Sequence, residues 1–280
     1  MRYAFIDGQR DSYPLVRLCH ALEVSRSGYS DWCARGKDSL QQEDEPLAAK
    51  IRVVHASSRG SYGSPWVSET LRRQGEPVNE KRVARIMRER GIVGRARRKY
   101  RATTDSKHAL PVAPNLLDRQ FSAPAPNLAW VSDITAMATG DGWWYLAVII
   151  DLCTRQVVGF AQAAHMRVEL LKQAFLIAYW RHKPGKEMAS HCDRGTQYCA
   201  HGLRDLLARL GIVQSMSRKA NCWDNAVAES FFHSSKVEQV QGRVYDTRAR
   251  AQAAVSDYIL GFCNPLRLHS SLDSLTELTL

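Results

Sequence analysis

The chain has 280 residues, of which 45% are hydrophobic and 24% charged, so it is long enough and apolar enough to form a globular core. No run of eighteen apolar residues occurs, and the N-terminus lacks the apolar stretch of a secretory signal, which argues against a membrane protein or a secreted one. Seven cysteines without a C-x-x-C pair favour reduced thiols in the cytoplasm, while a net charge of +11 indicates a polyanionic partner.

The positive charge is concentrated toward the N-terminus. Residues 1–120 contain 23 Lys and Arg against 14 Asp and Glu, whereas residues 121–280 contain 16 against 14. The first part of the chain is therefore expected to bind the polyanion. A basic but solvated surface would give the same net charge, so charge alone leaves both interpretations open.

Residues 1–45 are expected to form an N-terminal helical segment. Leu15, Leu18, Cys19 and Leu22 recur at helical spacing. The sequence EVSRSGYSDW that follows resembles the turn and second helix of a small helix-turn-helix unit. The acidic stretch KDSLQQEDEP is interpreted as a solvated helix start or a linker.

Residues 46–103 are expected to form a basic, helix-turn-helix-like DNA-binding region. Three helices are predicted, in LAAKIRVVHASS, SYGSPWVSETLRRQG and VNEKRVARIMRERG, the last with Asn79 as its N-cap and Gly91 as its stop. Between positions 81 and 101 stand ten basic residues and one acid, which is too few acids for ion pairs within that stretch to explain the charge. Contact with DNA phosphates is predicted instead of a solvated helix. The residues expected to make it are Arg85, Arg88, Arg95, Arg97, Arg98 and Lys99.

A linker and a mixed α/β domain are predicted next. Residues 104–127 hold four prolines and no sustained period, which indicates an extended linker, placed at 104–125. Residues 126–240 begin with an antiparallel meander of three strands, in LAWVSDITAM, Trp143 to Ile150 and Gln156 to Ala161. A helix, a strand (EMASHCD), a helix, a strand (IVQSMS) and a last helix from Asp224 complete a mixed sheet, and residues 241–280 form a helical tail.

Two aspartates in this domain are candidates for function, although Asp133 taken alone could equally be a polar residue at a strand edge. Asp133 interrupts a run of strong β-formers and Asp193 ends the fourth strand, whereas Asp141 and Asp151 lie in turns where Asp is expected for local hydrogen bonding. Carboxylates without basic partners at strand ends repel one another unless a cation joins them. Two hard divalent ions bound by carboxylate oxygens would satisfy them.

Three motifs in order resemble those of the OrfB-type DDE transposases of the IS-three insertion-sequence family: WVSDIT, HCDRGTQY and NCWDNAVAESFFHSSK. These proteins share the integrase catalytic core with retroviral integrases. Fifty-nine residues separate Asp133 from Asp193 and thirty-five separate Asp193 from Glu229, the latter being the family's spacing. Lys236 matches a basic position of the family, and the basic region is similar to the helical DNA-binding segment that precedes its core. The resemblance covers nearly the whole chain.

The resemblance implies an RNase-H-like core that performs metal-dependent DNA strand cleavage at insertion-sequence ends and then strand transfer, without a covalent protein–DNA intermediate. Asp133, Asp193 and Glu229 would be the catalytic residues and would bind two Mg²⁺ or Mn²⁺ ions, Asp133 both of them. Lys236 and Arg194 are expected to contact DNA phosphates. A homo-oligomer is expected when two ends are brought together, and an OrfA-type protein from the upstream frame, separate or fused, is a further expected partner.

Helical geometry assigns different roles to the two acids of the third motif. At 100° per residue, Asn225, Glu229 and Lys236 fall on one stripe. This supports Glu229 as the metal ligand, with Asn225 and Lys236 beside it toward DNA. Asp224 lies at the helix start, where a carboxylate caps free N–H groups.

The chain departs from the family at Cys192, where a serine is usual, and at Asp273, which replaces a glycine near the C-terminus. It also lacks a heptad leucine zipper and a full upstream recognition module, which is expected if these lie in a separate upstream frame. Two alternatives remain: an RNase-H-type nuclease that cuts without joining, and an inactive DNA-binding regulator.

Overall fold

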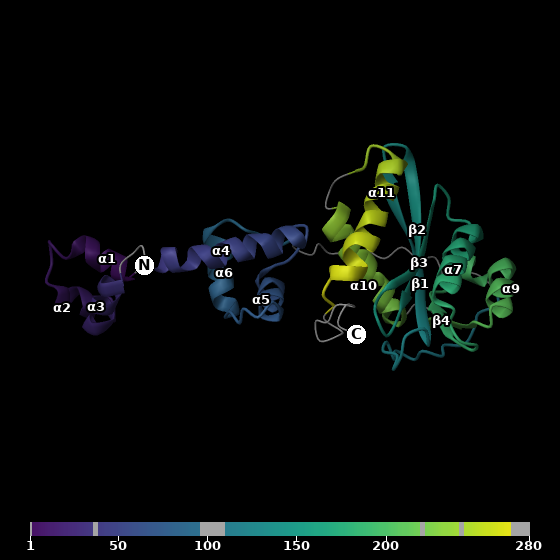
Figure 1. Cartoon of the computed structure of the whole chain (residues 1–280), viewed down its shortest axis with the longest axis horizontal. Helices are drawn as coiled ribbons and strands as arrows, with labels where there is room; N and C mark the ends of the chain where they lie inside the picture. Colours follow the sequence, from purple (N-terminus) through teal and green to yellow (C-terminus); the bar gives the residue numbers. More distant parts are fainter. Residues whose placement is uncertain (1, 36–38, 96–109, 219–221, 241–243, 270–280) are drawn as a thin grey trace. The chain divides into compact units, whose positions relative to one another are not determined.

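The computed structural model describes residues 2–35, 39–95, 110–218, 222–240 and 244–269 (Figure 1). Its contacts divide the chain into two compact units. The helical unit is made of Met1–Ser57 and Tyr62–Gly94, and the core unit of Ser58–Ser61 and Arg95–Leu280. No helix among the described residues is long and apolar enough to cross a membrane.

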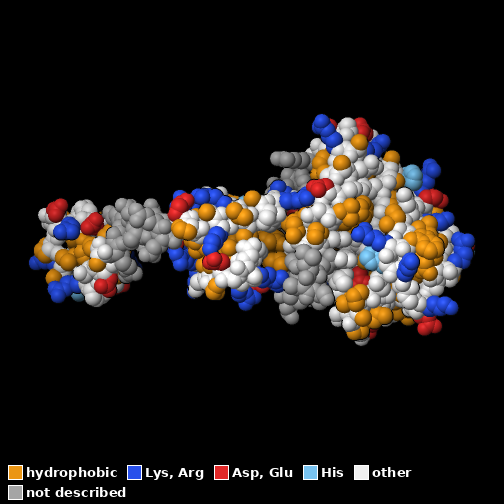
Figure 2. All heavy atoms as spheres, viewed as in Figure 1, with side chains coloured by type: hydrophobic (Ala, Val, Ile, Leu, Met, Phe, Trp, Pro, Cys, Tyr) orange, Lys and Arg blue, Asp and Glu red, His pale blue; other side chains and the backbone are white. Residues whose placement is uncertain are grey.

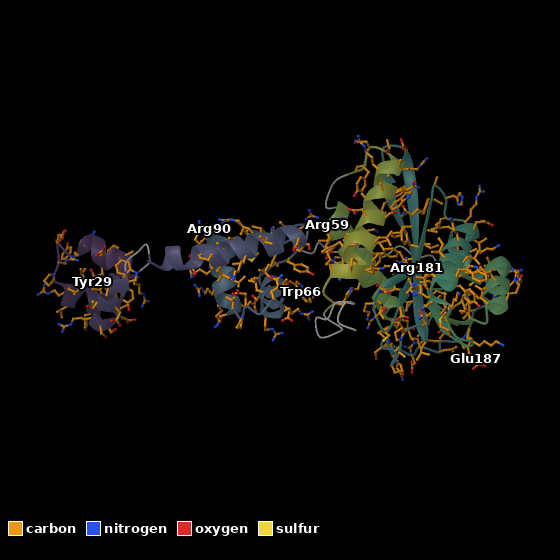
Figure 3. The ribbon with its side chains drawn as sticks, viewed as in Figure 1. Tyr29, Arg59, Trp66, Arg90, Arg181 and Glu187 are labelled. Atoms are coloured by element: carbon orange, nitrogen blue, oxygen red, sulfur yellow. The ribbon has the colours of Figure 1, made fainter. Side chains whose placement is uncertain are left out.

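The helical unit begins with three short helices: α1 (Arg2–Gln9), α2 (Leu15–Ala21) and α3 (Arg26–Arg35). Their buried side chains include Ile6, Leu18 and Tyr29, and Tyr29 lies among the three helices in Figure 3. Between α2 and α3 the backbone passes through Glu23 with a φ of 54°, in the left-handed region common where helices end. EVSRSGYSDW therefore holds a turn and a second helix, as its pattern predicts.

Three further helices complete the helical unit: α4 (Ser39–Ser57), α5 (Ser64–Arg73) and α6 (Glu80–Glu89). Each buries one apolar face, with Ile51, Leu71 and Ile86 at most 1% exposed. Asn79 is the N-cap of α6, since its side chain accepts a hydrogen bond from the Lys81 N–H at 2.8 Å. From Ser39 onward the acidic stretch before Leu47 lies inside α4, so this part is a helix start rather than a linker, while Lys37 and Asp38 lie outside the described residues.

The core unit is built on a five-stranded sheet in the order β3-β2-β1-β4-β5. Its strands are β1 (Ala129–Thr139), β2 (Gly142–Asp151), β3 (Val157–Ala163), β4 (Ala189–Cys192) and β5 (Val213–Met216). The first three form the predicted antiparallel meander, and β4 and β5 add to β1 in parallel. The mixed sheet is therefore confirmed.

Helices cover both faces of this sheet (Figure 1). On one face lie α7 (Val168–His182) and α9 (His201–Arg209), with the short α8 (Thr196–Cys199) before α9, and their apolar side chains join the sheet in one cluster with Trp130, Ile149 and Phe175. On the other face lie α10 (Ala226–Ser235) and α11 (Arg248–Tyr258). Short helical segments adjoin these helices: the 3-10 helix η1 (Cys222–Asn225), the π-helices η2 (Lys236–Val240) and η3 (Ile259–Cys263), and the α-helix α12 (Asn264–Leu266).

The C-terminal elements are hydrogen-bonded to the backbone of the sheet at two places. Asn264 makes two hydrogen bonds of 3.1 Å with the backbone of Val157, accepting from its N–H and donating to its carbonyl, so it pairs with β3 as a neighbouring strand would. At the other place Tyr245 bridges Thr139, and the Gly140 N–H donates to the Tyr245 carbonyl at 2.8 Å. The last helices are therefore part of the core unit.

The described end of the predicted linker lies along β5. The Leu116 N–H donates to Ser215 Oγ at 2.9 Å, and the Met216 N–H donates to the Pro114 carbonyl at 3.3 Å. Residues 110–119 therefore pack along β5 as part of the core unit before β1 begins.

Candidate active site

The three predicted acids lie on three elements of the core unit. Asp133 is on β1, Asp193 directly follows β4, and Glu229 lies in the first turn of α10, which packs on β1. β1 and β4 run parallel with Val131 opposite His191, so Asp133 and Asp193 each stand two residues beyond the same register position. The topology therefore brings both aspartates to one end of the sheet, under the helix that holds Glu229.

The three carboxylates influence one another electrostatically. Burial raises the pKa of Asp133 well above its usual value, and the negative charges of Asp193 and Glu229 add to the increase. Burial and the charge of Asp193 likewise raise the pKa of Glu229. Backbone donors partly compensate: the Ile134 N–H donates to Asp133 at 2.7 Å and the Gly195 N–H to Asp193 at 2.8 Å.

The chemistry of these side chains fits a hard divalent cation. Two aspartates and a glutamate supply oxygen ligands, and the repulsion that raises the pKa of Asp133 is what a cation between them would relieve. Within the described residues, no three His, Cys, Asp or Glu side chains yet stand close enough together to hold one ion. The donor set is thus suitable, while its side chains are not in one coordination shell.

The predicted flanking residues differ in accessibility. Lys236, the first residue of η2, is partly buried, and burial lowers its pKa against the opposing effect of Asp133. The Arg194 guanidinium is partly buried and its Nε donates to the Ser217 carbonyl at 2.5 Å. Asn225 is only 4% exposed, which leaves little of its surface for DNA. All three stay predictions as DNA contacts.

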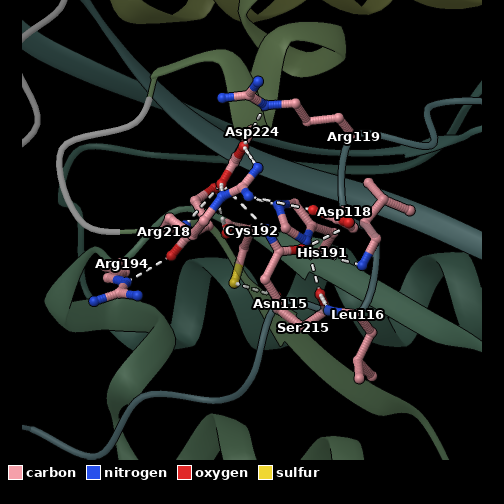
Figure 4. Close-up of polar contacts among 12 residues, drawn as sticks. Asn115, Leu116, Asp118, Arg119, His191, Cys192, Arg194, Ser215, Arg218 and Asp224 are labelled. Carbon is pink, nitrogen blue, oxygen red and sulfur yellow. Dashed lines mark hydrogen bonds and ion pairs between the residues drawn. The ribbon is translucent and has the colours of Figure 1, made fainter.

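Asp224 does not have the predicted capping role. Its carboxylate is fully buried and accepts hydrogen bonds from the side chains of Arg218, Arg119 and Asn115 (Figure 4). The bonds from Arg218 hold the pKa of Asp224 far below its usual value. We call these four residues the Asp224 network. The sequence could not reveal it, because Asn115 and Arg119 lie more than a hundred residues before Asp224.

Family models match three parts of the chain. Residues 41–100 match an HTH-like domain, and residues 123–222 and 229–278 match two models that are both described as an integrase core domain. Transposase InsF of insertion sequence IS3A from Escherichia coli (strain K12) is 38% identical over 272 residues, which is 96% of this chain and 94% of that protein. The chain belongs to the IS3 family of transposases. In this transposase, Asp133 and Asp193 lie within the first core match and Glu229 is the first residue of the second.

Two other proteins are similar to this transposase. A 31 kDa protein of insertion element IS600 from Shigella sonnei, described as uncharacterized, is 39% identical over 259 residues, or 92% of this chain and 95% of that protein. Among solved structures, the HTLV-2 integrase catalytic core domain in complex with magnesium aligns with 56% of this chain and 97% of its own, with 15% identity and a TM-score of 0.45. The family and the mixed sheet together confirm the predicted α/β, RNase-H-like core with a helical region before it.

The helical unit of the transposase contains ion pairs that the sequence did not suggest. Asp44 of α4, whose side chain is 6% exposed, binds Arg82 at 2.8 Å and Arg85 at 2.5 Å. Burial alone would raise the pKa of Asp44, but the two arginines lower it. Glu45 pairs with Arg90. Acids outside residues 81–101 therefore pair with part of the basic charge that the single acid within that stretch could not account for.

Other basic side chains remain available to a polyanion. Figure 2 shows Lys and Arg side chains spread over the surface of the helical unit. Arg88 is exposed and has no ion pair among the described residues, and Arg95 is partly buried. Arg85, bound to Asp44 and Glu89, still has a 41% exposed side chain. The predicted contacts Arg97, Arg98 and Lys99 lie outside the described residues.

Proposed function

We propose that this transposase cleaves DNA strands at the ends of its insertion sequence and transfers them to target DNA, using Asp133, Asp193 and Glu229 with two Mg²⁺ or Mn²⁺ ions. The observation that supports this proposal best is the electrostatic coupling of three carboxylates from three different elements at one end of the sheet. Membership of the IS3 family supports a transposition reaction in general.

Each side chain has a defined task in this proposal. Divalent ions, when bound, would activate a water or a DNA 3′-hydroxyl and stabilise the leaving oxygen. As the resemblance to the family implies, Asp133 would take part in holding both ions, and Asp193 and Glu229 would each take part in holding one. Lys236, whose charge acts on Asp133, would hold a DNA phosphate beside the acids.

DNA and further copies of the chain are the proposed partners. The HTH-like match and the basic helical unit support binding to DNA through phosphate contacts. Joining two transposon ends requires a complex with more than one chain. An OrfA-type protein from the upstream frame is a further proposed partner.

The test is Glu229→Gln, assayed with labelled insertion-end DNA and a target plasmid in Mg²⁺. We expect both cleavage and strand transfer to fall to background, because an amide is a poor ligand for a divalent ion. Glu169→Gln is the matched control: it changes an exposed glutamate that also lies in the first turn of a helix of the core unit, and should leave both reactions intact.

Each contrary outcome identifies an alternative. Unchanged activity of Glu229→Gln would remove the catalytic assignment. A wild-type protein that cuts the labelled ends but never joins them to the plasmid would be a nuclease. One that binds the ends without cutting would be a regulator.

A further inference from the structure

The Asp224 carboxylate is the centre of a dense buried network. Its side chain is 0% exposed and accepts five hydrogen bonds. Arg218 donates three of them, from its backbone N–H at 2.9 Å, Nε at 3.0 Å and Nη2 at 3.0 Å. Arg119 Nε donates at 3.2 Å and Asn115 Nδ2 at 3.1 Å. Both carboxylate oxygens therefore have partners (Figure 4).

This network connects the start of α10 to the edge strand β5, which pairs with β4, the strand that Asp193 follows. Arg218 lies two residues after the end of β5, and Asn115 belongs to the segment that lies along β5. Beside it, His191 of β4 contacts Ser215 Oγ at 2.8 Å and Ser217 Oγ at 3.2 Å, both in or after β5. Asp224 thus links the start of the Glu229 helix to the two strands that end beside Asp193.

Stability alone is a weak reason for such an arrangement. A buried carboxylate loses its hydration, and its attraction to arginines often does no more than offset that cost. The arginine side chains remain 51% and 45% exposed, which weakens the attraction further. A defined geometry is the better reason. The planar guanidinium group of an arginine can bind a carboxylate through two hydrogen bonds at once, which orients the two groups relative to each other.

The start of α10 needs such an external anchor. Asn225 precedes α10 and makes no capping hydrogen bond with its side chain, so this side chain does not fix where the helix begins. Asp224, one residue earlier, is held by three residues from outside the helix. Glu229 follows within the first turn of α10. A shift of this anchor would therefore shift the Glu229 carboxylate.

We propose that Asp224, held by Arg218 and Arg119, is a positioning residue that sets the distance of Glu229 from Asp193 and so the binding of the second metal ion. This inference rests on the proposed function. It assigns no contact with DNA or metal to Asp224 itself.

The test is Asp224→Asn, which keeps the size of the side chain but turns one acceptor toward the arginines into a donor. Loss of a residue that orients metal ligands typically costs about 10- to 100-fold in metal affinity. We expect a rise of this size in the Mg²⁺ concentration that gives half-maximal cleavage. Calorimetric titration with Mn²⁺ in the absence of DNA should show the same loss of affinity.

Asp151→Asn is the matched control. Asp151 is 1% exposed in the same unit and accepts hydrogen bonds from Asn127, Trp130, Cys153 and Thr154, none of them near α10 in sequence. It should lower the melting temperature without changing the Mg²⁺ requirement. An equal rise in the Mg²⁺ requirement of this control would overturn the inference, because it would show a general effect of stability.

Arg218→Gln keeps the test decisive if Asp224→Asn does not fold. Arg218 has a half-exposed side chain, so its replacement leaves Asp224 bound to Arg119 and should preserve the fold. A folded variant of either kind with the Mg²⁺ requirement and Mn²⁺ affinity of the wild type would refute the positioning role. Glu229→Gln, by contrast, tests the proposed function and can succeed when these variants refute the inference.

Discussion

The fold disfavours the ionised form of the Asp133 carboxylate. Asp133 lies on β1 between Ser132 and Ile134, and burial together with Asp193 and Glu229 raises its pKa well above the usual value. A group whose pKa is raised by folding stabilises the protein at low pH, and that contribution is lost as the pH rises through the folded pKa. Folding of the metal-free protein therefore becomes less favourable as the pH rises from the ordinary aspartate pKa toward the raised pKa of Asp133 in the folded state.

Asp133→Asn should raise the melting temperature in EDTA at pH 8, because an amide has no proton to lose and so avoids this loss of stability. The difference from the wild type should shrink as the pH falls toward about 2, well below the ordinary aspartate pKa of 3.8, where Asp133 is protonated in both the folded and the unfolded state. A gain of about 1 kcal/mol would appear as roughly 2–4 °C in a unit of this size. Asp205→Asn, an exposed site on α9, is the control and should show no such trend. A lower melting temperature of Asp133→Asn at pH 8 would contradict the prediction.

Among the elements, α6 contains arginines with two kinds of surroundings. Arg85 binds the buried Asp44 and the neighbouring Glu89, whereas Arg88 is exposed and unpaired among the described residues. The first contributes to the packing of α6 on α4. The second is free to neutralise a DNA phosphate.

Arg88→Ala should therefore weaken DNA binding and reduce the slope of log affinity against log salt by about 0.9, the effect of one phosphate contact. Its unfolding free energy should stay within about 0.5 kcal/mol of the wild type. Arg85→Ala should instead lower stability by about 1 kcal/mol, discounted for its exposure. Titrations at several salt concentrations and thermal unfolding separate the two. The reverse pattern would mean that Arg85 is the DNA contact.

The helix α6 and the strand β1 show which features of the structure the sequence could predict. The helix in VNEKRVARIMRERG, its Asn79 cap and the strand around Asp133 follow from local patterns, and they were found as predicted. The ion pair of Arg85 with Asp44 joins residues 41 positions apart, and the Asp224 network joins residues more than a hundred apart. Such contacts are created by the tertiary fold, so no local pattern contains them.

For the whole molecule, the C-terminal helices belong to the core unit as much as the sheet does. The turn between β1 and β2 holds the Tyr245 segment closely: a Cβ on Gly140 would lie 2.2 Å from the Asp246 carbonyl oxygen. Asp141 beside it accepts a hydrogen bond from the Arg248 N–H, the first residue of α11, at 2.9 Å. A side chain at position 140 would push this segment away.

Gly140→Ala should destabilise the core unit by about 1–3 kcal/mol, the usual range for overpacking. Hydrogen exchange should accelerate in α11, while α4 to α6 of the helical unit stay as protected as in the wild type. Gly185→Ala is the matched control, because a Cβ there meets nothing within 4 Å. Equal effects of the two variants would contradict the prediction.

The pairing of Asn264 with the Val157 backbone has a consequence for the timing of synthesis. Domains generally fold from the N-terminus as the ribosome adds about 5–20 residues per second, so the helical unit can fold early. The stretch between Asp133 and Asn264 takes on the order of ten seconds more at that rate. For most of this interval a nascent chain has its basic helices but not Glu229, and throughout it the chain lacks Asn264, which pairs with β3. Under the proposed function, a chain still on the ribosome could bind DNA before it could cleave it.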